Sequence, residues 1–332
     1  MRKIISFPHP TSSANPDDAG ASNTVWVLGT RSYIMGTLNI TPDSFSDGGL
    51  HNTVPAAVAY AESAVKNGAD IIDIGGCSTR PGAAEVSVEE EIRRVVPVIK
   101  ALRAANIAVP ISIDTFRASV ASAAVEAGAN CVNDVRALRE PGFTTVVKSL
   151  GVPVVMTHSR GADAGADKGY GFAGVMEGVK AELGLQVRSA LDAGVRRWNM
   201  IIDPGIGFSK SVAGNLDLIR DLAKFSGRHA AGNSRRASDG AGFPSALAAH
   251  VGVARQFNPN VMDHMPVLIG TSRKSYLGTL LGKPNAPPSE RGHATLAAVV
   301  ASIQQGSDIL RVHDVPACRD AALFADALYR TA

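Results

Sequence analysis

The sequence contains little charge, few aromatic residues and no long apolar run. Charged residues make up 19% of the 332 positions, aromatic residues 5%, and the formal net charge is +3. Because no basic stripe with interleaved aromatic residues is present, we expect no nucleic-acid partner. No apolar run has the roughly 20 residues that a bilayer-spanning helix requires, so we also expect no membrane partner.

Cysteine is also scarce. Cys77, Cys131 and Cys318 are isolated from one another and lack the spacing of a metal or redox motif. We therefore expect reduced thiols in a cytosol-like compartment rather than a disulfide framework. The N-terminus lacks the apolar core of a secretory signal, and its polar composition predicts a disordered lead-in over residues 1–23. An organelle address stays open.

The sequence does contain a recurring pattern in which an apolar run ends in polar residues. In Met200–Asp203, three apolar residues lead to an aspartate, and Pro204 follows. Such runs are typical of parallel strands buried on both faces, and proline ends the strand because it has no N–H to donate. The same pattern recurs over residues 111–115, 131–134, 267–274 and 309–313.

Segments with helical spacing of apolar residues lie between these runs, for example over residues 54–66, 175–193 and 290–305. The count is eight strands, each followed by a helix, which predicts one α/β domain, a (β/α)8 TIM barrel over residues 24–332. We expect a short N-terminal hairpin in which residues 25–28 and 33–35 flank a turn. We also expect a long insertion before strand seven, at about 226–263, whose composition predicts a disordered segment with a surface helix.

Polar side chains at the ends of these strands should meet, because the active site of such a barrel lies at the carboxyl ends of its strands. Asp114, Asn133, Asp203 and Lys274 suit a flat heterocycle with adjacent N–H donors and a carbonyl, such as a guanine-like or pterin ring. Arg311 is expected to stack on this ring.

A second group of hydrophilic residues suits an anion, because cationic side chains and backbone N–H groups both bind phosphate. Its members are Asn39, Thr79, Arg80, Arg311 and His313, together with the glycine-rich loop at 75–82. Asn39 precedes a loop at 41–49 that is rich in carboxyl and hydroxyl oxygens, the ligands that Mg²⁺ prefers; an ordinary turn-rich loop is the alternative.

Two further polar residues have a structural interpretation. We expect Asp73, which lies inside a strand, to be a carboxylate of the inner barrel layer rather than a catalyst. His158 follows the fifth strand and is expected to be a hydrogen-bonded residue of the barrel wall rather than a ligand or a base.

Seven segments, in order along the chain, together resemble the dihydropteroate synthase family. They are residues 38–49, 75–82, 113–115, 133–134, 203–210, 272–274 and 311–315, and the resemblance runs from about residue 34 to the C-terminus. It implies a barrel enzyme of folate biosynthesis that condenses 6-hydroxymethyl-7,8-dihydropterin diphosphate with p-aminobenzoate, releasing pyrophosphate and forming 7,8-dihydropteroate.

The resemblance also implies a role for each matching residue. The pterin would be held by Asp114, Asn133, Asp203 and Lys274, with Arg311 over its face; of these, Asp114, Asp203, Lys274 and Arg311 are the expected catalytic residues. The diphosphate would be held by Asn39, Arg80, Arg311 and His313, with Asn39 also contacting a Mg²⁺ cofactor. The p-aminobenzoate pocket, which is the sulfonamide site in this family, would be formed by Phe45, Thr79, Pro81, Phe208 and Ser272. Family members are commonly homodimers.

Two departures from the family pattern bear on the source of the chain. Many bacterial members have glutamate where this chain has Cys77, and the insertion at 226–263 is longer than theirs. Both features are similar to fungal members. We expect a cytoplasmic protein, with a mitochondrial location as the alternative if the chain is of fungal origin.

The same residues predict a mechanism. Mg²⁺ and the cationic side chains would neutralise the departing diphosphate, while the electron-rich pterin tolerates positive charge at its exocyclic CH₂ group. Asp114 would stabilise that charge, so our hypothesis is that the leaving group departs before the arylamine attacks. Three alternative functions stay open: a methyltetrahydrofolate-binding barrel, a Schiff-base aldolase with Lys274 as nucleophile, and a non-catalytic pterin-binding protein.

Overall fold

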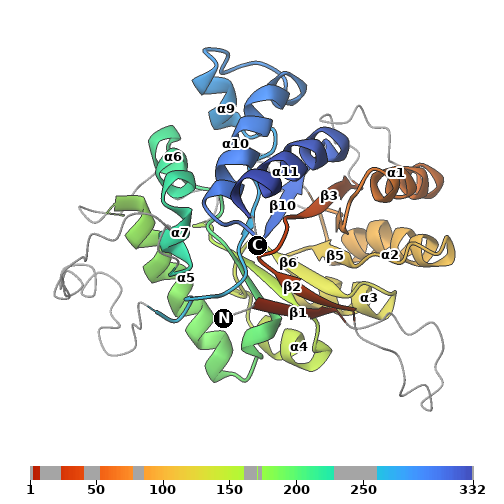
Figure 1. Cartoon of the computed structure of the whole chain (residues 1–332). Helices are drawn as coiled ribbons and strands as arrows, with labels where there is room; N and C mark the ends of the chain where they lie inside the picture. The colour runs from red at the N-terminus through yellow and green to blue at the C-terminus, as the bar shows by residue number, and fades with distance from the viewer. Residues whose placement is uncertain are drawn as a thin grey trace.

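The computed structural model describes residues 3–7, 24–40, 53–77, 86–160, 170, 174–227 and 260–330, and its central feature is an eight-stranded parallel barrel (Figure 1). The strand order is β8-β7-β6-β5-β4-β3-β10-β9. A parallel bridge between Ile202 and Val267 links β8 to β9 and brings the two ends of the sheet together. The predicted TIM barrel is therefore confirmed.

The barrel strands are short and fall where the apolar runs predicted them. Their bounds are β3 Tyr33–Asn39, β4 Ile71–Gly75, β5 Ile111–Asp114, β6 Cys131–Asp134, β7 Val154–Thr157, β8 Met200–Asp203, β9 Leu268–Ile269 and β10 Ile309–Val312. Nearly all of their residues are buried, because the barrel interior covers one face and the helices cover the other.

A ring of helices surrounds the strands, as Figure 1 shows. Serine or threonine side chains cap three of these helices: the side chains of Thr53, Ser87 and Ser211 accept hydrogen bonds from backbone N–H groups three residues on. The helices are α1 Val54–Lys66, α2 Val88–Ala104, α3 Ala118–Glu126, α4 Phe143–Leu150, α5 Gly174–Asp192, α6 Val212–Arg220, α7 Leu222–Phe225, α9 Ser275–Leu280, α10 Gly292–Gln304 and α11 Val315–Tyr329, with 3-10 turns η3 Arg197–Asn199 and η4 Pro288–Arg291.

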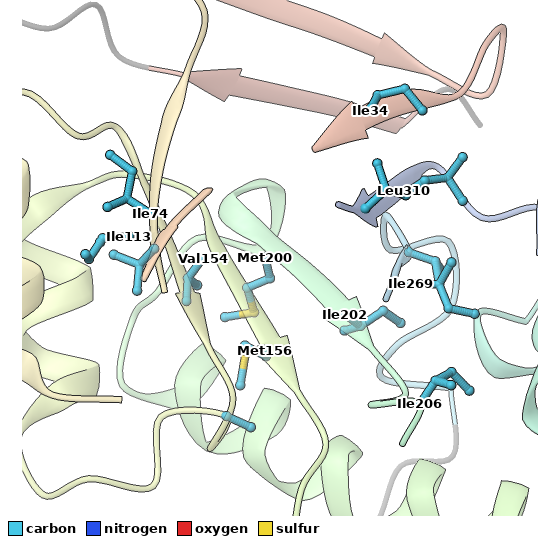
Figure 2. Close-up of a cluster of buried hydrophobic side chains, with 14 of the residues drawn as sticks. Ile34, Ile74, Ile113, Val154, Met156, Met200, Ile202, Ile206, Ile269 and Leu310 are labelled. Carbon is cyan, nitrogen blue, oxygen red and sulfur yellow. The ribbon is translucent and has the colours of Figure 1, made fainter. Parts of the chain in front are cut away.

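Side chains alternate along each strand between the helix layer and the barrel interior. Ile74, Ile113, Val154, Met200 and other outward residues belong to the large core beneath the helices, shown in Figure 2. A second, smaller cluster of inward residues fills the interior near the amino ends of the strands; it includes Tyr33, Met35, Ile71, Val155, Ile201, Leu268 and Ile309. The next inward position on each strand, toward its carboxyl end, is where the polar residues lie.

The sequence-based description of the N-terminus is wrong in two respects. Residues 3–7, placed in the disordered lead-in, form strand β1 (Lys3–Phe7), which pairs antiparallel with β2 (Thr24–Leu28). The predicted hairpin partners are also wrong, because residues 33–35 belong to barrel strand β3. The reason is burial: Ile5, Phe7 and Leu28 join the inward cluster and cover the amino end of the barrel. The rest of the lead-in lies outside the described residues.

Two further features differ in how far the sequence predicted them. The sequence did not indicate the position of helix α4, because it is only eight residues long and Gly142 precedes it directly. The predicted insertion lies almost entirely outside the described residues, so its surface helix stays a prediction. Among the helices in the described part of the chain, none is both long and apolar enough to span a membrane.

Candidate active site

The inward polar residues at the carboxyl ends of the strands lie side by side around the barrel. The parallel register pairs Asn39 with Gly75, Gly75 with Asp114, and Asp114 with Asn133. On the far side, Thr157 pairs with Asp203. Residues far apart in sequence therefore converge on one end of the barrel, because residues paired in parallel strands lie at the same height along the barrel axis. We call this group of residues the barrel mouth.

Arg311 joins three of these strands. Its Nε donates to Oδ2 of Asp73 at 2.6 Å, and its Nη2 donates to Oδ2 of Asp114, also at 2.6 Å. The side chain of Asn133 donates from Nδ2 to the same Asp73 oxygen at 3.1 Å. Asp73 is fully buried, and it holds the guanidinium and the carboxamide at fixed positions. This agrees with its expected place in the inner layer and adds two contacts that the sequence did not suggest.

Asp203 lies at the end of β8, where Pro204 stops the strand. Its Oδ1 accepts a hydrogen bond from the backbone N–H of Gly205 at 2.7 Å, and its Oδ2 accepts one from the hydroxyl of Thr157 at 3.3 Å. Burial raises the pKa of Asp203, although the Gly205 N–H and the charge of Lys274 oppose the shift. Two neutral donors thus orient a carboxylate that has little access to water.

Lys274 approaches the mouth from the loop after β9. Its ammonium lies over the ring of Phe208, 4.3 Å from the ring centre, so the two side chains contact each other directly. Burial and the charge of Arg311 lower the pKa of Lys274 to about 8, although the charges of Asp203 and Asp114 oppose the shift. The charges of Lys274, Asp203 and Asp114 therefore interact with one another inside the mouth.

His313 and Ser272 form the edge of the mouth between β10 and β9. The Ser272 hydroxyl accepts from the backbone N–H of His313 at 3.2 Å and lies 3.0 Å from the Nδ1 atom of its ring. Ser272 is buried, whereas His313 is only half-buried. The histidine ring is thereby anchored at one nitrogen beside the strand that carries Arg311.

Comparison with known proteins shows the family to which the chain belongs. The family model described as pterin binding enzyme matches residues 35–313. A dihydropteroate synthase from Synechocystis sp. is 39% identical over 95% of this chain and 96% of its own length. The chain belongs to the dihydropteroate synthase family.

A solved dihydropteroate synthase from Xanthomonas albilineans, bound to 4-aminobenzoic acid, superposes with a TM-score of 0.74; it is 39% identical and covers 98% of this chain and 100% of its own. The mitochondrial folate synthesis bifunctional protein of Arabidopsis thaliana is 39% identical over 92% of this chain. The chain spans about half of that plant protein, 51% of its length.

The structure brings together most of the site residues that the sequence singled out for a dihydropteroate synthase. Asn39, Asp114, Asn133, Asp203, Lys274 and Arg311 lie within the mouth; Phe208, Ser272 and His313 lie at its edge. The other four, Phe45, Thr79, Arg80 and Pro81, lie outside the described residues, so their roles stay predictions.

Two residues of this end of the barrel were missed as site residues. Thr157 orients Asp203, and its only signal in the sequence was its place at the end of a strand. Lys210 ends the loop that follows β8, and it is buried. Lysine is usually exposed, so nothing in the sequence indicated this burial.

Asn39, the expected Mg²⁺ contact, is one of the described residues. The described part of the chain contains no group of three or more His, Cys, Asp or Glu side chains suited to a metal. Asn39 ends β3 with a half-buried carboxamide, and its Oδ1 is a hard oxygen donor of the kind that Mg²⁺ takes together with phosphate oxygens and water.

Proposed function

We propose that this protein condenses 6-hydroxymethyl-7,8-dihydropterin diphosphate with p-aminobenzoate, forming 7,8-dihydropteroate and releasing pyrophosphate. The observation that carries the proposal is the convergence of Asp114, Asn133, Asp203, Lys274 and Arg311 at one end of the barrel. Membership of the dihydropteroate synthase family supports it, as does the arylamine bound to the Xanthomonas albilineans relative.

The pterin ring is assigned to the buried part of the mouth. Its amino group and ring N–H donate to carboxylates, and Asp203 supplies one that is already oriented by Thr157 and Gly205. Asn133 offers a carboxamide oxygen, since its Nδ2 is engaged with Asp73. Lys274 donates to the carbonyl or to a ring nitrogen. Such polar groups in a buried site discriminate strongly, because a ligand without the matching groups would leave them unpaired.

The diphosphate is assigned to the cationic edge. Arg311 lies on β10 and His313 follows directly after the end of that strand, and Arg80 belongs to the loop that the sequence places beside them. Asn39 would hold Mg²⁺, which supplies charge neutralisation to the diphosphate when it is bound. Cationic side chains in a site with little water stabilise the negative charge that grows on the departing diphosphate.

The chemical step breaks one bond and forms another at the exocyclic carbon of the pterin. The C–O bond to the diphosphate breaks first, and both electrons leave with pyrophosphate. The cation that remains is delocalised into the pterin, and the Asp114 carboxylate stabilises it. The amino nitrogen of p-aminobenzoate then forms the C–N bond and loses one proton to solvent. Because the carbon is already cationic, no strong base is required.

The arylamine is assigned to the pocket beside Phe208 and Ser272. Phe208 contacts Lys274 and Ser272 contacts His313, so this pocket adjoins both the pterin region and the diphosphate region. Phe45, Thr79 and Pro81 complete the pocket in the proposal. Sulfonamides, which share the arylamine group, would compete there.

One assay tests the function. The purified protein is incubated with Mg²⁺, the pterin diphosphate and p-aminobenzoate, and both pyrophosphate and dihydropteroate are measured. We expect equal amounts of the two products, and we expect Asp203→Ala to form neither. Absence of dihydropteroate from the folded wild-type protein at millimolar substrate would exclude the proposed reaction. A burst of pyrophosphate that strictly requires p-aminobenzoate would exclude departure before attack.

We further propose a homodimer in the cytoplasm, with the mitochondrion as the alternative compartment. Several apolar side chains of α11 face solvent, including Leu323, Phe324 and Leu328, with exposed fractions of 53%, 67% and 55%. Exposed apolar groups of this kind favour association with a second copy. Cys131 and Cys318 are buried free thiols, which supports a reducing compartment. Light scattering tests the dimer, and fractionation of the source cells tests the compartment.

A further inference from the structure

The proposed reaction gives no role to Lys210, a buried lysine beside the mouth. Lys210 ends the loop that follows β8, and only 7% of it is exposed. Its ammonium donates to the backbone carbonyls of Gly205 and Phe208, both at 2.8 Å, and its third contact is Nδ1 of His158 at 3.1 Å. An ammonium group has three hydrogens to donate, so these contacts account for all of them. The carbonyl of His158 lies farther away, at 3.4 Å.

His158 is itself held in one orientation. Its Nε2 lies 3.0 Å from Oε2 of Glu182, and the guanidinium of Arg160 donates to both oxygens of that carboxylate. A carboxylate only accepts, so Nε2 carries the proton and Nδ1 is the acceptor that meets Lys210. Burial lowers the pKa of His158 to about 4, which keeps the ring neutral in this arrangement. Glu182, His158 and Lys210 therefore form one chain of hydrogen bonds.

The loop that Lys210 contacts has an unusual backbone. Gly205 has φ +71, Gly207 has φ +83, and Ser209, although it carries a side chain, has φ +51. A residue with a side chain in this region is disfavoured, so the loop conformation depends on contacts from outside. The backbone N–H groups of Gly205 and Gly207 are held by Asp203 and Asn215, and Lys210 holds two of its carbonyls.

The loop also carries a wall of the arylamine pocket. Two contacts fix the position of Phe208. Its carbonyl accepts a hydrogen bond from Lys210, and the Lys274 ammonium lies over its ring. A Cβ atom on Gly207 would lie 2.9 Å from Cδ of Lys274, so the loop and the Lys274 side chain are packed tightly. A shift in the loop would therefore move Phe208 directly, whereas Lys274 belongs to the separate loop after β9.

We propose that Lys210, oriented by His158 and Glu182, is a positioning residue for the p-aminobenzoate pocket. It touches no substrate; it fixes the loop so that Phe208 keeps its position beside the pterin region. This inference rests on the proposed function. It predicts that loss of Lys210 affects p-aminobenzoate more than the pterin diphosphate, because Phe208 is carried by the loop itself, whereas Asp203 is also held by Thr157 and by the barrel ladder.

The test compares Lys210→Met with a matched lysine. Methionine keeps most of the volume and removes every donor. Lys224→Met is the control, because Lys224 is exposed and pairs with Asp221 on the surface. We expect Lys210→Met to raise KM for p-aminobenzoate at least tenfold, to change Kd for the pterin diphosphate less than threefold, and to keep the wild-type circular dichroism. We expect the control to match wild type in all three.

Two further variants keep the inference testable if Lys210→Met does not fold. Glu182→Gln removes the anion that fixes the His158 tautomer, and it should raise KM for p-aminobenzoate three- to tenfold. His158→Asn keeps an acceptor near the Nδ1 position, so its KM for p-aminobenzoate should stay within threefold of wild type. His158→Leu has no acceptor and should resemble Lys210→Met. These ligand-specific changes in KM distinguish positioning from a general structural role.

The outcomes separate this inference from the proposed function. A wild-type protein that forms no dihydropteroate contradicts the function itself. An active wild type together with a folded Lys210→Met variant of unchanged KM for p-aminobenzoate contradicts the role of Lys210 alone. Equal weakening of both substrates in the folded variants also contradicts it, because Lys210 would then support the mouth as a whole.

Discussion

Arg311 and Asp114, which are 197 positions apart in the sequence, are joined by a hydrogen bond of 2.6 Å across the mouth of the barrel. The same guanidinium binds Asp73, so one cation lies between two carboxylates that are both largely excluded from water. Two buried carboxylates without a partner would repel each other and lose hydration. The pairing therefore allows Asp114 to remain an anion where the proposed mechanism requires one.

Arg311→Met should therefore lose both activity and stability. Removing one partner of a buried ion pair costs about 3–5 kcal/mol, because the remaining charges are left unpaired. We expect turnover to fall at least a hundredfold and the free energy of unfolding in urea at pH 8 to fall by that amount. The control is Arg93→Met, since the Arg93 side chain is 75% exposed and pairs on the surface, and it should change stability by less than about 1 kcal/mol. A fully stable Arg311→Met protein would contradict this account.

The division of the mouth into a ring region and a diphosphate region predicts two different losses. Asp203→Ala should abolish binding of the pterin with or without its diphosphate, because it removes the acceptor for the ring donors. Arg80→Ala should mainly weaken the ligand that carries the diphosphate. Calorimetry with both ligands on both variants measures this. Equal effects of the two substitutions on the two ligands would contradict separate regions.

The barrel and most of its mouth were predictable because strand alternation is a local property. An apolar run that ends in Asp or Asn gives both the strand and its end, and parallel register brings the ends together, as with Asp114 and Asn133. Strand β1 was not predictable in this way. Its five residues are followed by a long polar stretch, and its partner β2 begins only at Thr24. Only the assembled end of the barrel therefore shows why Ile5 and Phe7 are buried.

Contacts made by long side chains were also beyond prediction. The sequence placed Arg311 at a strand end but gave no sign that it reaches Asp73 and Asp114 at once. Lysine is among the residues least often buried, so Lys210 within a glycine-rich loop carried no signal of its three internal contacts. Both cases depend on three-dimensional neighbours that no spacing rule encodes.

Gly205 should tolerate no side chain. Its φ is +71, and a Cβ atom would lie 2.0 Å from the backbone oxygen of His158. Gly282 is a close match in backbone conformation, with φ +69, but a Cβ atom there would meet nothing within 4 Å. We expect Gly205→Ala to lower the free energy of unfolding by about 2–5 kcal/mol, since left-handed strain and overpacking add, and Gly282→Ala by about 1 kcal/mol. Equal losses in urea denaturation would contradict the close approach.

Asp114 should give activity a pH dependence. Burial, together with the charges of Asp73 and Glu91, raises its pKa to about 7 against the opposing charge of Arg311. Below that pH the carboxyl group is protonated and cannot stabilise a cationic CH₂ group, so kcat/KM for the pterin diphosphate should rise as pH increases through about 7. Asp114→Asn should be slow and lack this rise.

The same shift makes a prediction about stability with a definite sign. Between the unfolded pKa of Asp114, 3.8, and its folded pKa of about 7, the folded protein holds the proton more tightly than the unfolded chain. The contribution of this group is therefore fully present below pH 3.8 and is lost as pH rises through about 7. Asp114→Asn has no such group, so its Tm relative to wild type should be higher at pH 8 than at pH 5. Thermal melts of both proteins at the two pH values measure the difference, and a gap that stays constant or reverses would show that Asp114 does not titrate in this range.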